Sequence, residues 1–139
     1  MNQKERAKKK FELWREHPEV FITKVLGTEK LEDYQVRLIQ TVAKNKYTTI
    51  RSCHATGKTF TLGRLVLWFY SVYPNSIVIS TAPTYTQVEA LLWGEIREAF
   101  KKSKYPLGGK LLQTKLTKSD KWFCLGASTQ KKLAIVKSS

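Results

Sequence analysis

A phosphate-binding pattern is the clearest chemical signal in this sequence. Gly57-Lys58-Thr59 matches the end of the pattern G-x-x-x-x-G-K-[ST], with Ser52 where the pattern begins with glycine. Glycine lets a backbone approach phosphate oxygens, a lysine ammonium can contact the β- and γ-phosphates of a nucleotide, and a threonine hydroxyl can bind Mg²⁺. Because the tripeptide is short, its flanking segments decide how it is interpreted.

The flanks of this tripeptide favour nucleotide binding over a plain turn with a surface lysine. Residues 47–51 are rich in β-branched and aromatic types, which predicts a strand, and apolar residues recur at helical spacing over 62–70. Backbone N–H groups at the start of a helix, together with the helix dipole, attract an anion. We therefore expect ATP and Mg²⁺ to bind here, with Lys58 acting on the phosphates and Thr59 on the metal. The rest of the loop that would bind the nucleotide consists of Ser52, Cys53, His54, Ala55 and Thr56.

Two further side chains stand in or beside this loop. Arg51 can stabilise charge that develops on a transferred phosphoryl group, which would make it catalytic together with Lys58; it can equally be a surface charge at the end of the strand. His54 suits the role of a hydrogen-bond donor or spacer in the loop better than that of a catalytic base.

Tyr34-Gln35 is a second candidate for nucleotide contact. A glutamine amide offers one donor and one acceptor, which match N6 and N7 of adenine, and an adjacent aromatic ring can stack on a base. A tyrosine on a helix face is more often a core residue, so the pair gains weight only from the phosphate-binding pattern downstream. We predict that Tyr34 and Gln35 contact adenine.

Thr81-Ala82-Pro83-Thr84 follows a short apolar run, residues 77–80, that predicts a strand covered on both faces. Ligands of open α/β sheets bind outside the carboxyl ends of the strands, so this segment is expected on the same rim as the phosphate-binding loop. A contact with DNA and a simple capped helix start are equally good interpretations, because Thr84 and Gln87 have the spacing of a capping box.

These elements predict an α/β protein with a partial P-loop NTPase fold. Strand, helix and strand over residues 47–80 form a βαβ core with parallel strands, preceded by N-terminal helices. Residues 111–117 and 122–125 predict a C-terminal strand hairpin whose turn spans 118–121. We divide the chain into a basic helical arm, residues 1–30, and an incomplete ATPase domain, residues 31–139.

The charge balance points to nucleic acid. The chain of 139 residues has 25 lysines and arginines against 11 acidic residues, a formal net charge of +14. Such a charge attracts polyanions through phosphate contacts, although it can also serve only solubility, and it says nothing about sequence specificity. Double-stranded DNA is the expected partner.

The cysteine content and the hydropathy indicate where in a cell the protein is expected. Cys53 and Cys124 are far apart and in no metal-ligand spacing, which indicates a reducing interior. No apolar run approaches the roughly 20 residues of a membrane span, so no membrane contact is expected. We expect a cytoplasmic location, in a bacterial host cell if the resemblance described next holds.

The ordered set of segments resembles the large subunit of the terminases of tailed bacteriophages. The matching segments are Leu31-Glu32-Asp33-Tyr34-Gln35, residues 51–59, residues 81–88, residues 91–97 and residues 121–126. The resemblance covers most of the chain, from about residue 11 to about residue 129. No single motif in it is decisive, whereas the set in this order is fairly specific.

The resemblance implies a motor that couples ATP hydrolysis to the packaging of duplex DNA. Such proteins carry an N-terminal ATPase domain and a C-terminal metal-dependent nuclease, form a ring at the portal and work with a small terminase subunit. By position, Gly57, Lys58 and Thr59 correspond to the family's phosphate-binding loop, and Tyr34-Gln35 to its adenine motif. Portal, small subunit and further copies of the chain are therefore implied partners.

The sequence departs from the family's pattern in ways that bear on activity. The apolar run 133–136 is followed by Lys137 and Ser138, where the family has the Asp-Glu pair that holds Mg²⁺ and activates water. Many family members also have an arginine inside the loop, whereas here the nearest is Arg51, just before it. We therefore expect nucleotide binding without useful hydrolysis by this chain alone, as from a truncated or split terminase. The alternatives are a helicase-like P-loop protein and a basic DNA-binding protein with no packaging role.

Overall fold

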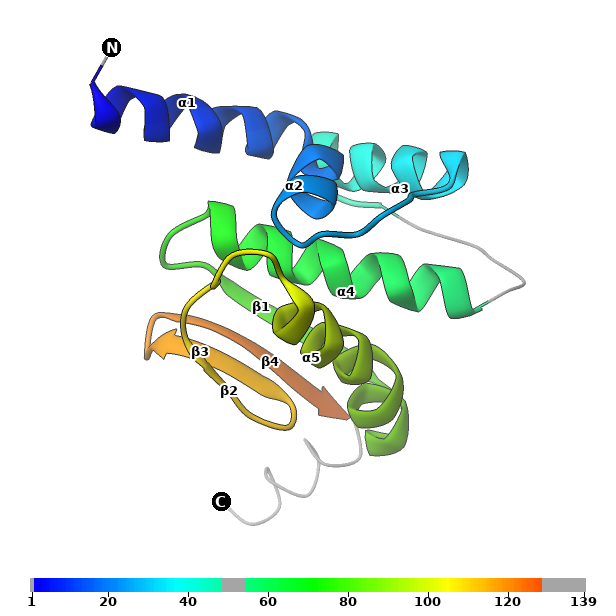
Figure 1. Cartoon of the computed structure of the whole chain (residues 1–139). Coiled ribbons are helices and arrows are strands. Elements are labelled where there is room, and N and C mark those ends of the chain that lie inside the picture. Colours follow the sequence, from blue (N-terminus) through cyan, green and yellow to red (C-terminus); the bar gives the residue numbers. More distant parts are fainter. Residues whose placement is uncertain (1, 49–54, 129–139) are drawn as a thin grey trace.

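A computed structural model describes residues 2–48 and 55–128 of the chain, and these form a mixed α/β fold. Figure 1 shows one face of a sheet covered by helices, with further helices packed on the far side of that layer. The helices are α1 (Gln3–Glu16), α2 (Pro18–Lys24), α3 (Asp33–Lys44), α4 (Ala55–Val72) and α5 (Trp93–Lys102), and the π-helical segment η1 (Gln87–Leu92) leads directly into α5.

Within residues 2–48 and 55–128, the sheet contains four strands in the order β1-β4-β3-β2. They are β1 (Ile77–Ala82), β2 (Lys110–Leu111), β3 (Lys115–Ser119) and β4 (Trp122–Ser128). The antiparallel pairing of β3 with β4 confirms the hairpin, although the run predicted over 111–117 is divided between β2 and β3. The edge strand β1 pairs in parallel with β4, with Val78 opposite Cys124 and Ser80 opposite Gly126.

The parallel pair differs from the one that the sequence predicts. We expected residues 47–51 to form the first strand of a βαβ unit ending in 77–80. Tyr47 and Thr48 do not lie in a strand, and residues 49–51 lie outside the described part of the chain. Parallel strands are therefore confirmed, but between β1 and β4, while the P-loop fold itself stays a prediction.

The core lies between α4, η1 with α5, and one face of the sheet. Trp93 is its centre: it is fully buried, and its indole N–H donates a hydrogen bond of 3.1 Å to the Ser80 hydroxyl of β1. The same ring lies against Gly126 of β4, where a Cβ atom would overlap the indole and Val88. Trp93 thus packs the helix layer against the sheet, and its position leaves room only for a glycine at position 126.

The prediction that β1 is covered on both faces is wrong for the residues that the structure describes. Ile77 and Ile79 are 53% and 55% exposed, while Val78 between them packs against the core. The alternation arises because side chains of a strand point to opposite faces, and the described helices cover only one.

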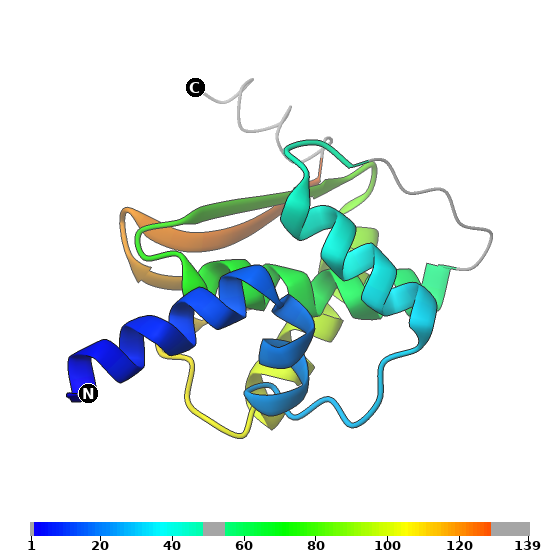
Figure 2. The ribbon, with the colours of Figure 1, turned by 90° about the horizontal axis from the view of Figure 1, so that it is seen from above.

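The N-terminal helices pack on the far side of α4, as Figure 2 shows from above. α2 buries Phe21 and Ile22 in the core, and Gly27, with φ of 78°, lets the chain turn after that helix. α1 contains no buried residue, and its first half extends beyond the rest of the molecule. Within residues 2–48 and 55–128, no helix is long and apolar enough to cross a membrane.

Candidate functional site

The phosphate-binding pattern lies at the beginning of α4. This helix begins at Ala55, so Ala55, Thr56, Gly57 and Lys58 form its first turn and Thr59 follows. The first few N–H groups of a helix, those before its hydrogen-bond ladder begins, point along its axis toward whatever lies beyond its end. The backbone geometry that the pattern requires on its helical side is therefore present. Arg51, Ser52, Cys53 and His54, the remaining predicted loop residues, lie outside the described residues.

Tyr34 is brought directly onto this first turn. Its hydroxyl lies against Gly57, where a Cβ atom would overlap the hydroxyl oxygen and approach the ring carbon that bears it to 3.3 Å. The tyrosine is 50% exposed, so the ring borders both the helix start and solvent. Two segments that the sequence analysis singled out separately, Tyr34 and Gly57, are therefore neighbours in space.

Gln35 connects the start of α3 to the same turn. Its amide oxygen accepts the backbone N–H of Glu32 at 2.8 Å, and its amide nitrogen donates to the Thr61 hydroxyl at 3.1 Å. Thr61 in turn donates to the Gly57 carbonyl at 2.7 Å. This chain of bonds fixes α3 against α4 at the phosphate-binding turn.

The same bonds limit what Gln35 has left to offer to a ligand. The side chain is buried, and with one bond to each amide atom it retains only one N–H and one lone pair. Glu32 and Gln35 form a capping box at the start of α3, which is not among the features predicted from the sequence. The spacing of an acidic residue and a glutamine three positions later was the available signal.

The carboxyl ends of β1 and β4 lie on the same side of the molecule as the start of α4 (Figures 1 and 2). The segment Thr81-Ala82-Pro83-Thr84 leaves the sheet there, and the Thr84 hydroxyl accepts the backbone N–H of Gln87 at 3.3 Å. That bond confirms the capping contact predicted from the spacing of Thr84 and Gln87. The strand ends and the start of α4 therefore lie on the same side, while loop residues 51–54, to which the prediction of a common rim also refers, lie outside the described part of the chain.

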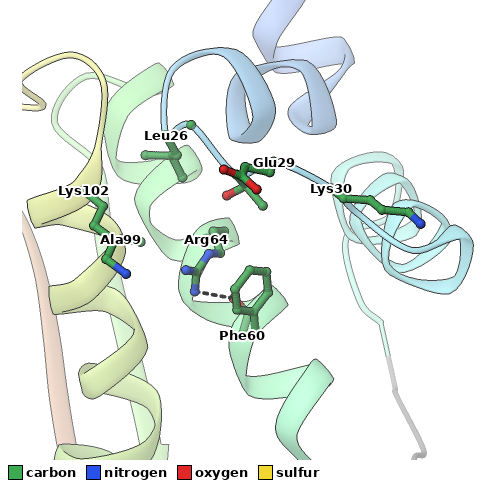
Figure 3. Close-up of a pocket in the computed structure, with 9 residues that line it drawn as sticks. Leu26, Glu29, Lys30, Phe60, Arg64, Ala99 and Lys102 are labelled. Carbon is green, nitrogen blue, oxygen red and sulfur yellow. Dashed lines mark hydrogen bonds between the residues drawn. The ribbon is translucent and has the colours of Figure 1, made fainter.

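Arg64 occupies a buried position on α4 that the sequence did not distinguish from the surface. Its guanidinium donates to a Glu95 carboxylate oxygen at 2.7 Å and to the Phe60 carbonyl at 3.2 Å, and lies 3.5 Å from the centre of the Phe60 ring. Figure 3 shows Arg64 and Phe60 at a cavity of about 460 Å³ between α4, α5 and the segment after α2. The ion pair joins α4 to α5, which makes Arg64 a structural residue of the helix layer.

Among the described residues, the side chains whose pKa departs clearly from its ordinary value do not lie at the start of α4. Burial raises the pKa of the Cys124 thiol to about 12, so this thiol stays protonated and is not a nucleophile at neutral pH. Burial also lowers the pKa of Lys118, whose ammonium lies 4.0 Å from the centre of the Trp122 ring. Within the described part of the chain, no group of three or more His, Cys, Asp or Glu side chains could hold a metal ion.

Comparison of the chain with protein-family models, with curated proteins and with solved structures gives no match. The assignment of a function therefore rests on the residues and their geometry.

Proposed function

We propose that this chain is the nucleotide-binding part of a DNA-packaging ATPase of the terminase large-subunit type. The observation that carries the proposal is the position of Gly57, Lys58 and Thr59 at the start of α4, on the side of the molecule where the parallel strands β1 and β4 end. An oxyanion beyond this helix end would meet outward-pointing N–H groups and the positive end of the helix dipole.

Each side chain has a defined task in this proposal. Lys58 supplies a positive charge to the terminal phosphates, and the Thr59 hydroxyl is the ligand for the Mg²⁺ that accompanies ATP. Tyr34, half exposed and in contact with Gly57, borders the space where the base or ribose would lie. Arg51 would act on the charge of the phosphoryl group.

The proposal assigns binding rather than hydrolysis to these 139 residues. Phosphoryl transfer also needs carboxylates that position the metal and the attacking water. No apolar run of the sequence is followed by an Asp-Glu pair. DNA is the proposed polymer partner, because a net charge of +14 favours phosphate contacts along a duplex.

Titration calorimetry with ATP and Mg²⁺ tests the proposal. The wild-type chain is expected to bind, and Lys58→Ala to weaken binding by at least about tenfold, because one charge-assisted phosphate contact is lost. Lys44→Ala is the control, since this exposed lysine is the last residue of α3, away from the start of α4. Equal affinities of the wild type and of Lys58→Ala would refute the nucleotide site, provided that circular dichroism shows both to be folded.

A basic DNA-binding protein without a nucleotide site is the second candidate. It is favoured by the net charge of +14 and by the engagement of the Gln35 amide in bonds within the protein. This candidate predicts DNA binding that weakens steeply with salt and is indifferent to ATP, whereas a packaging motor predicts that ATP changes the affinity for DNA.

A further inference from the structure

A large cavity lies away from the start of α4, between α1, α2 and the segment after α5. Its volume is about 840 Å³, and its lining includes Leu13, Trp14 and Phe21 from the two helices and Tyr105 and Leu107 from the segment. We call this cavity the α1–α2 groove. Leu13 and Tyr105 are 45% and 61% exposed, so apolar side chains of the groove remain open to solvent.

The charged side chains that line the α1–α2 groove are all lysines. They are Lys10 of α1, Lys24 of α2, Lys104 after α5 and Lys118 of β3. A groove lined by apolar side chains and by positive charges fits a ligand that is apolar along one side and carries acidic groups along its edges.

We propose that the α1–α2 groove binds an acidic amphipathic helix of a partner protein. Such a helix carries apolar residues at helical spacing, which would enter the groove, and carboxylates on both flanks, which would meet the lysines. The volume is in the range of pockets that accept several side chains. The proposal does not depend on the nucleotide site, because no residue of the groove lies at the start of α4.

The arrangement of the aromatic rings argues for a helix rather than for single-stranded nucleic acid. Phe11 and Trp14 meet at an interplanar angle of 78°, and Trp14 and Phe21 at 74°, with centroids 5.4 and 5.5 Å apart. In each of these contacts the edge of one ring points at the face of the other, so the rings stand nearly perpendicular, whereas stacking on successive bases needs open parallel faces.

The test measures the fluorescence anisotropy of labelled probes with the full chain. The main probe is a peptide of about 14 residues with leucines at positions i, i+3, i+4 and i+7 and glutamates elsewhere. The second peptide has serines in place of the leucines and keeps the charge, so it measures attraction to a basic protein alone. A thymidine oligonucleotide is the third probe.

Matched variants decide the outcome. Leu13→Ser is compared with Leu112→Ser, because these leucines are 45% and 44% exposed and only Leu13 lines the groove. Lys10→Glu with Lys24→Glu is compared with Lys9→Glu with Lys44→Glu, since Lys24 and Lys44 both end a helix and Lys9 precedes Lys10 on α1. Every variant is first checked for an unchanged thermal transition.

We expect the leucine-containing acidic peptide to bind, and each groove variant to weaken it by at least about tenfold more than its control. The serine peptide should bind weakly and respond equally to the groove and control lysine variants. Three results would overturn the proposal. They are no binding of the leucine peptide, equal losses in groove and control variants, and an oligonucleotide whose affinity falls in the groove variants as much as that of the peptide.

Discussion

Replacing Gly126 by alanine tests how the helix layer is seated on the sheet. A Cβ atom at this position of β4 would overlap the Trp93 indole and Val88, and both residues are buried and have little room to move. Overpacking of a core costs about 1–3 kcal/mol, and displacement of the indole would also weaken its 3.1 Å bond to Ser80. The substitution also offsets roughly 0.5–1 kcal/mol of this destabilisation, because glycine loses more backbone freedom on folding than alanine. We therefore expect a net loss of about 2 kcal/mol.

Urea unfolding followed by circular dichroism measures this loss. Gly94→Ala is the matched control, because this glycine lies in α5 and an added Cβ would have no atom within 4 Å apart from its chain neighbours and the backbone of its own helix. It should stabilise the chain by up to about 1 kcal/mol through helix propensity alone. Equal effects of the two substitutions, or a neutral Gly126→Ala, would refute the placement of Trp93 over β4.

Two further predictions concern buried charge and pH. Glu95→Gln leaves the Arg64 guanidinium buried beside a neutral partner and should destabilise the chain by about 2 kcal/mol, whereas Glu98→Gln, at an exposed pair with Lys102, should have no measurable effect on urea unfolding. The Cys124 thiol has its ordinary pKa of 9.0 when unfolded and about 12 when buried, so its contribution to stability is complete below pH 9 and is lost as the pH rises toward 12. Unfolding free energies measured from pH 8 to pH 11 should therefore fall with pH, and Cys124→Ala should reduce that slope; an unchanged slope would show that the thiol is not buried.

Local patterns in the sequence predicted much of the fold. The helical spacing of 62–70 corresponds to α4, and the apolar runs at 77–80 and 122–125 correspond to β1 and β4. These signals are short-range, because each depends on residues within a few positions of one another. The hairpin of β3 and β4 was predictable for the same reason.

Contacts between distant segments were not predictable. The parallel pairing of β1 with β4 joins residues far apart in the sequence, such as Ser80 and Gly126, and the Leu125 carbonyl accepts a hydrogen bond from the Ser80 hydroxyl. The burial of Arg64 depends on Glu95 of another helix, and the exposure of Ile77 and Ile79 depends on which face the helices cover. The periodicity within one segment contains no information about its partners in another segment.

The sequence predicted the kind of candidate site but not the contacts among its residues. The pattern Gly57-Lys58-Thr59 correctly indicated a helix start, and the structure adds that Tyr34 lies on Gly57. Gln35 was predicted as an adenine contact, and its bonds to Glu32 and Thr61 show a structural role in addition. A side chain that offers one donor and one acceptor can satisfy a base or the protein itself, and only the fold decides which groups lie within reach.

A nitrogen-15 NMR titration with ATP and Mg²⁺ tests the central claim most directly. If the start of α4 binds the phosphates, the amide resonances of Gly57, Lys58 and Thr59 should shift most and saturate together. In Lys58→Ala, those of Gly57 and Thr59 should reach saturation only at ATP concentrations at least about tenfold higher. Shifts confined to basic surface segments such as α1, with the amides of Gly57 to Thr59 unmoved, would contradict the claim.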